Sequence, residues 1–168
     1  MGNLGGNEIS CAYYKNKETI SLLYDYSQVE SWSDEIKMMH NEAKNNLKFI
    51  DIYINGQKIE FNTKYTSDKK GQIQVKFIFH KLLTNISYMF CRCYSLISID
   101  LSSFNVINVT NMKGIFYECY NLKSIDLSTC NKNQIINMSD IFSKCYSLKS
   151  IDLSSFNTTN VTNMRYIL

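Results

Sequence analysis

The stretch CYSLKSIDLSSFN, residues 145–157, is the third copy of one phrase in this chain. Residues 93–105 read CYSLISIDLSSFN, and residues 119–131 read CYNLKSIDLSTCN, so that the copies follow each other at a period of 26 residues. The same spacing holds for a row of asparagines at Asn85, Asn111, Asn137 and Asn163. A fixed period of this length with recurring leucines predicts a stack of repeat units, each burying the apolar side of the next.

Each repeat unit has two hydrophobic periodicities. In SIDLSSF, residues 150–156, apolar and polar side chains alternate, which predicts a half-buried strand. In TNMKGIFYECYNL, residues 110–122, the apolar side chains recur at helical spacing, and Thr110 or Asn111 could cap a helix. We therefore expect an α/β leucine-rich repeat solenoid over residues 83–168, with one parallel strand and one short helix in each 26-residue coil.

The first half of the chain predicts a smaller unit ahead of the repeats. Residues 1–17 are rich in Gly and Asn and are expected to be a flexible tail. Residues 18–82 are expected to form a small α+β domain that caps the open apolar end of the first repeat unit.

Three local patterns support that α+β assignment. Residues 30–47 predict a helix with Ser33 as its cap and with Ile36, Met39 and Ala43 on one face. FIDIYINGQKIEF, residues 49–61, predicts a hairpin that turns at Asn55–Gly56. Residues 72–80 alternate as a further strand.

The repeat phrase NVTNM…F..CY.LKSIDLSSFN resembles the BspA-like leucine-rich repeats, the 26-residue-repeat surface proteins once grouped as a mycoplasma family of unknown function. The matching positions cover about residues 83–168. The resemblance implies a leucine-rich repeat fold and a role in binding other macromolecules. In bacteria such repeats sit on secreted adhesins and lipoproteins, and similar repeats occur in expanded families of amoeboid and ciliated protists.

A polar strip is the candidate partner-binding surface. The strand pattern places an aspartate row on the outer face of the repeats, with serines on either side and lysines three residues earlier. In the structural interpretation this face is only solvated, and in the functional interpretation it binds a repetitive ligand. The strip comprises Asp100, Asp126, Asp152, Ser98, Ser124, Ser150, Ser102, Ser128, Ser154, Lys123 and Lys149.

The cysteines are expected to be reduced and mostly structural. Cys93, Cys119 and Cys145 contribute one thiol to each unit, so that they form a row and do not converge as the four ligands of a metal site must. Cys130 replaces the phenylalanine of the other units, which indicates an apolar slot. Cys91 lies at a variable position and is expected to be exposed.

Neither an enzyme nor a cofactor site is expected. His40 and His80 have no nucleophile at a defensible motif spacing, and no glycine loop that could cradle a phosphate follows a strand. The net charge of +3 does not suggest a nucleic-acid partner. The partner is expected to be a protein or another macromolecule.

The location has several readings. No apolar run is long enough to span a bilayer and no secretory signal is present, so the default expectation is cytoplasmic. Gly2 and Cys11 could instead carry two acyl chains that anchor the chain to a membrane. The alternative is the cell surface, where glycosylation sequons at Asn85, Asn108, Asn137, Asn157 and Asn160 would matter.

The last repeat unit is incomplete in this sequence. Met164, Ile167 and Leu168 begin a fourth unit that does not continue. We expect either self-association through this uncapped end or a truncated fragment of a larger repeat protein. The leading functional hypothesis is a non-enzymatic interaction module that uses the sheet face of the repeats, and an adhesin-like surface protein is the alternative.

Overall fold

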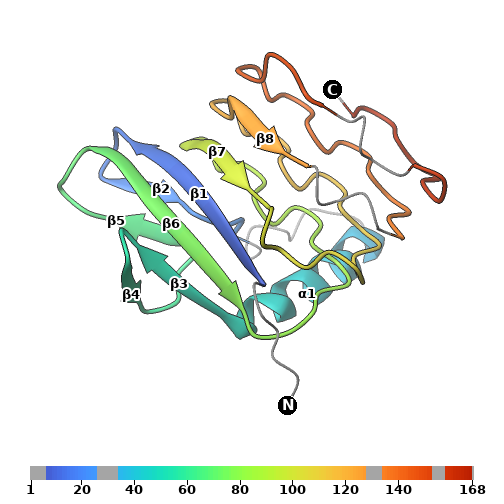
Figure 1. Cartoon of the computed structure of the whole chain (residues 1–168), viewed down its shortest axis with the longest axis horizontal. Coiled ribbons are helices and arrows are strands. Elements are labelled where there is room, and N and C mark those ends of the chain that lie inside the picture. The colour runs from blue at the N-terminus through green and yellow to red at the C-terminus, as the bar shows by residue number, and fades with distance from the viewer. Residues whose placement is uncertain (1–6, 26–33, 128–133, 153–157, 168) are drawn as a thin grey trace.

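Two β-sheets and one α-helix dominate the computed structural model, which describes residues 7–25, 34–127, 134–152 and 158–167 (Figure 1). The elements in chain order are β1 (Glu8–Lys15), β2 (Thr19–Ser21), α1 (Asp34–Asn46), the 3-10 helix η2 (Leu47–Phe49), β3 (Ile50–Ile54), β4 (Gln57–Ile59), β5 (Lys64–Thr66), β6 (Gly71–Phe79), β7 (Leu96–Asp100) and β8 (Ser124–Asp126).

The larger sheet has six strands in the order β4-β3-β6-β1-β7-β8, and the smaller sheet pairs β2 with β5. Every neighbouring pair in the larger sheet is antiparallel except β7 and β8, which are parallel. The sheet is therefore mixed, and it runs without a break from the N-terminal half of the chain into the repeats (Figure 1).

Strand β1 joins the two halves of the protein. It pairs with β6 over its full length on one side and with β7 on the other. The sequence predicts a flexible tail over residues 1–17, but in the described part of that range residues 8–15 form this inner strand. Its alternation, with Ile9, Cys11 and Tyr13 buried, is present in the sequence, but the nearby glycines and asparagines obscured it.

The other local predictions for the first half agree with the structure. Strands β3 and β4 form the hairpin, and both Asn55 (φ 48°) and Gly56 (φ 84°) have the left-handed backbone that a type I′ turn requires. Helix α1 lies within the predicted range and buries Ala43 completely. The proposed cap, Ser33, lies outside the described residues.

No helix occurs in the described residues from 83 onward, which contradicts the expected strand-plus-helix unit. A helix needs consecutive N–H groups that donate to the carbonyl four residues earlier. Here alternate N–H groups donate to the next repeat unit instead. Examples are Tyr88 N to Lys113 O at 2.9 Å, Phe90 N to Ile115 O at 3.0 Å and Arg92 N to Tyr117 O at 2.8 Å.

The remaining N–H groups of this segment close tight turns. Met89 N donates to Ile86 O at 3.2 Å and Cys93 N to Phe90 O at 3.1 Å. The third residue of each turn, Tyr88 or Arg92, has a left-handed backbone with φ 58°. Such turns also place apolar residues on one side of the chain, which explains why the sequence pattern imitates a helix.

The expected leucine-rich repeat solenoid is therefore wrong. The described chain is a β-rich domain with a mixed six-stranded sheet, a two-stranded sheet and a single α-helix, and its repeat units do not close as coils of strand and helix. Among the described residues of the repeats, parallel pairing between units is limited to β7 with β8 and to single bridges in the asparagine row. In the third unit, residues 150–152 are described but are not a strand.

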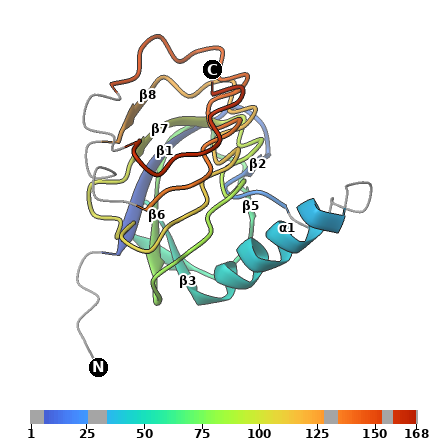
Figure 2. The ribbon, with the colours of Figure 1, turned by 90° about the vertical axis from the view of Figure 1, so that its right-hand side faces the viewer.

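The repeat units nevertheless stack on each other: successive units lie side by side in Figure 1, and their ribbons overlap in the view of Figure 2. The rings of Phe90, Phe116 and Phe142 lie one above the other, with centroids 5.9 and 5.8 Å apart. Phe77 of β6 meets Phe90 edge-on at 5.7 Å, so that the aromatic column continues into the N-terminal half. All four side chains are buried, and this column is the centre of one continuous core.

The asparagine row has a structural role that explains its spacing. The side-chain oxygen of each of the four residues accepts a hydrogen bond from the backbone N–H two residues later, at 2.9 to 3.2 Å. Isolated parallel bridges connect the same residues from one unit to the next. The asparagine predicted as a possible helix cap, Asn111, thus makes a cap-like bond, but the bond closes a turn.

Candidate functional site

The predicted polar strip lies on the outer face of the six-stranded sheet. Parallel pairing of β7 and β8 places Ser98 opposite Ser124 and Asp100 opposite Asp126. The side chains of Asp100, Ser124 and Asp126 are exposed, and that of Ser98 is half-buried. Strand β1 extends the strip toward the N-terminal half, because Ser10 is the antiparallel partner of Asp100.

The other members of the strip extend it in chain order. Exposed side chains are those of Ser102, Lys123, Lys149, Ser150 and Asp152. Ser128 and Ser154 lie outside the described residues. The structure therefore places every described member of the strip at the surface, with Ser98 the least exposed.

A shallow hollow of about 460 Å³ lies on this face and crosses four strands. Its polar lining comes from Ser10 of β1, Gln74 of β6, Ser98 and Asp100 of β7, and Ser124 and Asp126 of β8. Part of this lining belongs to the N-terminal half, which the repeat alignment could not reveal. Six of the ten residues that line the hollow have hydrogen-bonding polar side chains, and the hollow lies where the two halves of the chain meet.

Asp100 also has a local structural task. Its Oδ1 atom accepts a hydrogen bond from the backbone N–H of Ser102 at 2.8 Å, which turns the chain at the end of β7. The carboxylates of Asp100 and Asp126 lie on neighbouring strands, where like charges about 4.8 Å apart repel by roughly 1 kcal/mol in water. A partner that brings hydrogen-bond donors or positive charge would relieve this repulsion.

The five described cysteines are buried, including Cys91, which was expected at the surface, whereas Cys130 lies outside the described residues. Cys91 is only 2 % exposed, and burial raises the pKa of its thiol to about 12. The sequence prediction for Cys91 fails because the chain turns here, with Cys91 N donating to Tyr88 O at 2.9 Å, and the side chain joins the core, whereas the prediction assumed a helix. Cys11, proposed for acylation, is also in the core, where burial raises the pKa of its thiol well above the ordinary value. Gly2 lies outside the described residues.

The row of Cys93, Cys119 and Cys145 is buried as predicted. In addition, two of its thiols donate to main-chain carbonyls of the preceding unit: Cys119 Sγ to Phe90 O at 3.0 Å and Cys145 Sγ to Phe116 O at 3.1 Å. Among the described residues, no cluster of three or more His, Cys, Asp or Glu side chains could hold a metal ion.

Two of the predicted sequons contribute to the repeat architecture. Asn85 is 4 % exposed and Asn137 is half-buried, and the side-chain oxygen of each closes a turn. Asn108 and Asn160 are exposed, whereas Asn157 lies outside the described residues. A glycan on Asn85 is incompatible with this fold.

The sequence analysis overlooked two further columns of the repeat. Tyr94, Tyr120 and Tyr146 are one period apart, and their rings stack at the surface with centroids 4.9 and 5.4 Å apart. Beside them, Glu118 accepts hydrogen bonds from Arg92 and Lys144 of the neighbouring units. Both columns follow the 26-residue period of the sequence, but the helix expected for this segment did not predict that these side chains would meet across units.

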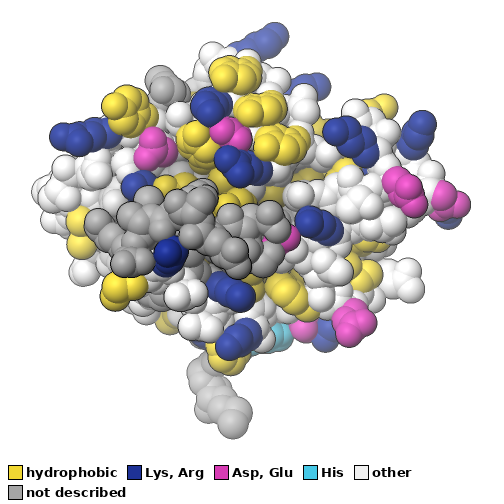
Figure 3. All heavy atoms as spheres, turned by 180° about the vertical axis from the view of Figure 1, so that it is seen from behind, with side chains coloured by type: hydrophobic (Ala, Val, Ile, Leu, Met, Phe, Trp, Pro, Cys, Tyr) yellow, Lys and Arg dark blue, Asp and Glu magenta, His cyan; other side chains and the backbone are white. Residues whose placement is uncertain are grey.

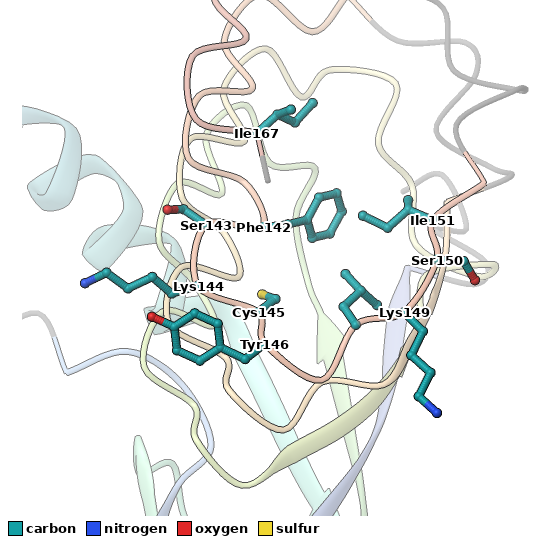
Figure 4. A pocket seen from close by; sticks show the side chains of 10 residues that line it. Phe142, Ser143, Lys144, Cys145, Tyr146, Lys149, Ser150, Ile151 and Ile167 are labelled. Atoms are coloured by element: carbon teal, nitrogen blue, oxygen red, sulfur yellow. The ribbon is translucent and has the colours of Figure 1, made fainter.

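A larger hollow, of about 620 Å³, opens in the last complete unit (Figure 4). Its apolar lining comprises Phe142, Cys145, Leu148, Ile151 and Ile167. In the unit below, Phe116 and Cys119 hold the equivalent positions, and the stacked ring of Phe142 covers Phe116. The hollow is therefore a surface of the kind on which one repeat unit receives another.

A contact between His80 and Asp51 was not predicted from the sequence. His80 Nε2 lies 3.1 Å from Asp51 Oδ2, and Lys58 Nζ lies 2.7 Å from the same oxygen. The lysine and histidine side chains are about half exposed, so both contacts lie at the surface, where the Lys58–Asp51 ion pair adds little stability. The side chain of His40 lies outside the described part.

Comparisons with known proteins give one family. The model of a family described as "Mycoplasma protein of unknown function, DUF285" matches residues 54–168, which is more than half of the chain. No curated protein and no solved structure matches the chain. In the described residues, no helix has the length and apolar character needed to cross a membrane.

Proposed function

Because the chain belongs to this DUF285 family of mycoplasma proteins of unknown function, we propose its function from its surface: a non-enzymatic module that binds a macromolecule on its sheet face. The main support for this proposal is the hollow with polar lining across β6, β1, β7 and β8. Its serine, glutamine and aspartate side chains offer many hydrogen bonds at a regular spacing, which suits an extended partner that presents donors.

A closer relation to the BspA-like surface proteins remains part of this proposal. The repeat phrase supports it, and it would place the module on a cell surface as an adhesin-like protein. N-linked glycans at the exposed sequons Asn108 and Asn160 would be chemical evidence for that location.

The experiment compares the purified protein with a strip variant on an array of extracellular-matrix proteins, peptides and glycans. The strip variant is Asp100→Asn with Asp126→Asn, because asparagine keeps the acceptor that closes the turn at Ser102 while it removes the charge. The matched control is Glu60→Gln with Asp68→Asn, which also removes two negative charges, from exposed positions outside the strip. Binding that the strip variant loses and the control keeps supports the proposal. A bound partner whose affinity neither variant changes contradicts it.

A second candidate function is self-association through the hollow of the last unit. The equivalent positions of the unit below receive a repeat unit, so a second copy of the chain could supply a matching surface. Light scattering across a range of concentrations tests this with Ile151→Asp, which charges the hollow. Ile107→Asp is the control, because Ile107 is apolar and 56 % exposed elsewhere on the repeats. A wild-type chain that stays monomeric at every concentration rules this candidate out.

A further inference from the structure

The tyrosine row is the most ordered exposed aromatic feature of the described chain. Tyr94, Tyr120 and Tyr146 are 44 %, 36 % and 77 % exposed, respectively. Their planes are inclined by only 26° and 19° between neighbours. Because each ring already packs on the next, a partner that binds this row does not have to immobilise the rings.

Two cations lie beside the row: Arg92 and Lys144 each precede a tyrosine of the row by two residues, as Glu118 precedes the third. These three positions carry two basic residues and one acidic residue, which leaves an excess of one positive charge. Lys123 and Lys149 also lie in the turn segments, but they belong to the polar strip.

The single carboxylate is already engaged. Glu118 Oε2 accepts a bond from Arg92 Nε at 3.0 Å, and its Oε1 accepts one from Lys144 Nζ at 2.7 Å. The Glu118 side chain is 9 % exposed, whereas those of Arg92 and Lys144 are 47 % and 43 % exposed. An arginine has five N–H donors and a lysine three, so both side chains can donate to a further acceptor from solvent.

The geometry also restricts the class of partner. Nucleic-acid bases and sugar rings bind tyrosine through its open ring faces. Here the faces are turned toward each other: both faces of Tyr120 are covered, and only Tyr94 and Tyr146, at the two ends of the row, have one face that no other ring of the row covers. What the row presents to solvent is ring edges and hydroxyl groups. Tyrosine and arginine in this form are typical of protein–protein interfaces.

We propose that the tyrosine row and its flanking cations form a second docking surface, which binds an acidic segment of a partner polypeptide. Carboxylates of the partner accept hydrogen bonds from the tyrosine hydroxyls and from Arg92 and Lys144, while its aliphatic atoms cover the ring edges. Figure 3 shows the face opposite that of Figure 1, where hydrophobic side chains gather near the top with Lys and Arg side chains and a smaller number of Asp and Glu side chains among them. This surface is separate from the polar hollow on the sheet, and neither proposal depends on the other.

The test measures the fluorescence anisotropy of a labelled poly-glutamate peptide with the full chain at low ionic strength. A labelled oligothymidylate of equal charge serves as the competing probe. The row variant is Tyr94→Ala with Tyr146→Ala, and both rings are exposed enough for the fold to survive their loss. The control variant is Tyr14→Ala, since Tyr14 is 54 % exposed on β1, outside the row. Thermal unfolding confirms that each variant is folded.

We expect the row variant to bind poly-glutamate about tenfold more weakly than the wild type and the control variant to bind it unchanged. Tyr146→Phe, which keeps the ring and removes the hydroxyl, should weaken binding by a smaller factor. Wild-type protein that does not bind poly-glutamate overturns the proposal, as does a row variant that binds it equally well. Tighter, row-dependent binding of the oligothymidylate also overturns it, because the surface would then serve a nucleic acid.

Discussion

Lys144 Nζ lies 2.7 Å from Oε1 of Glu118, a residue exactly one repeat period earlier in the chain. On the other side, the second carboxylate oxygen of Glu118 accepts from Arg92, which lies one period earlier again. All three residues have the same left-handed backbone, with φ values of 58°, 60° and 63° in chain order. One carboxylate thus connects three successive repeat units.

The first prediction is that Glu118→Gln destabilises the protein by about 1–2 kcal/mol, because the largely buried side chain loses a charge-assisted bond to at least one cation. Urea unfolding followed by circular dichroism measures this loss. Glu60→Gln is the matched control, since Glu60 is exposed on the loop after β4, and it should change the free energy of unfolding by less than about 0.5 kcal/mol. Equal stabilities of the two variants would show that the bonds from Arg92 and Lys144 to Glu118 contribute no measurable stability.

The second prediction concerns acid. Burial acts to raise the pKa of the Glu118 carboxyl, but the hydrogen bond from Lys144 and the charge of Arg92 outweigh it, so that the pKa lies below its ordinary 4.5. A group whose folded-state pKa is depressed contributes stability above its unfolded pKa and loses that contribution as the pH falls through the folded value. The stability difference between wild type and Glu118→Gln should therefore be constant near neutral pH and shrink below about pH 4.5.

The wild type has to be compared with Glu118→Gln because the pKa of the Asp51 carboxyl is also lowered. The hydrogen bond from Lys58 lowers the pKa of the Asp51 carboxyl, so the wild-type chain alone would report both groups. Subtracting the Glu118→Gln curve removes the contribution of Asp51. A difference between the two curves that stays constant to pH 3 would contradict the assignment.

Much of the local structure could be predicted from the sequence because its signals are short-range. The Asn55–Gly56 turn, helix α1 and the alternation of β6 depend on neighbouring residues, and the structure has all three. The outward orientation of Asp100 and Asp126 follows from the same alternation. These features require no knowledge of distant partners.

The errors have a common physical cause. In the turn segments, apolar residues recur every three or four positions, as in a helix, but their alternate N–H groups bond to a unit 25 residues later in the chain. Sequence periodicity describes which side chains share a face and does not reveal where the N–H groups donate. The same limit applies to β1, whose partners β6 and β7 lie far away in the chain.

The third prediction concerns thiol reactivity. Cys11, Cys91, Cys93, Cys119 and Cys145 are buried, and burial raises the pKa of each thiol, to about 12 for Cys91 and about 11 for Cys145. Alkylation at mildly alkaline pH should therefore leave Cys11, Cys91, Cys93 and Cys119 unmodified in the folded protein, because almost no thiolate forms and the sulfur atoms are covered. Cys145, which is 8 % exposed and lines the hollow of the last unit, should react slowly.

Peptide mass spectrometry after N-ethylmaleimide treatment, with and without guanidinium, reads each cysteine separately. The unfolded sample is the control, in which all five should be modified. Cys91 decides between the sequence prediction and the structure. Its rapid modification in the folded protein would restore the exposed position predicted from the sequence and would contradict the burial of its side chain.

The fourth prediction is that Gly114→Ala costs about 2–4 kcal/mol of folding free energy. Gly114 has φ 55°, and a Cβ atom added there would lie 2.5 Å from Cε1 of the Tyr88 ring one unit earlier. Asp140 and Tyr166 hold the equivalent positions of later units with φ 59° and 51°, so side chains are tolerated in this backbone where no such ring approaches. The clash with Tyr88 should therefore add to a modest backbone strain.

Gly56→Ala is the matched control, because Gly56 also has a positive φ, 84°, and has no atom within 4 Å of an added Cβ. It should show the backbone strain alone, about 1–2 kcal/mol. In a Tyr88→Ser background, Gly114→Ala should cost no more than this control does, since the ring that it meets is gone. If Gly114→Ala costs as much in that background as in the wild type, the Tyr88 ring is not the reason for glycine at position 114. The left-handed backbone would then be the sole cause.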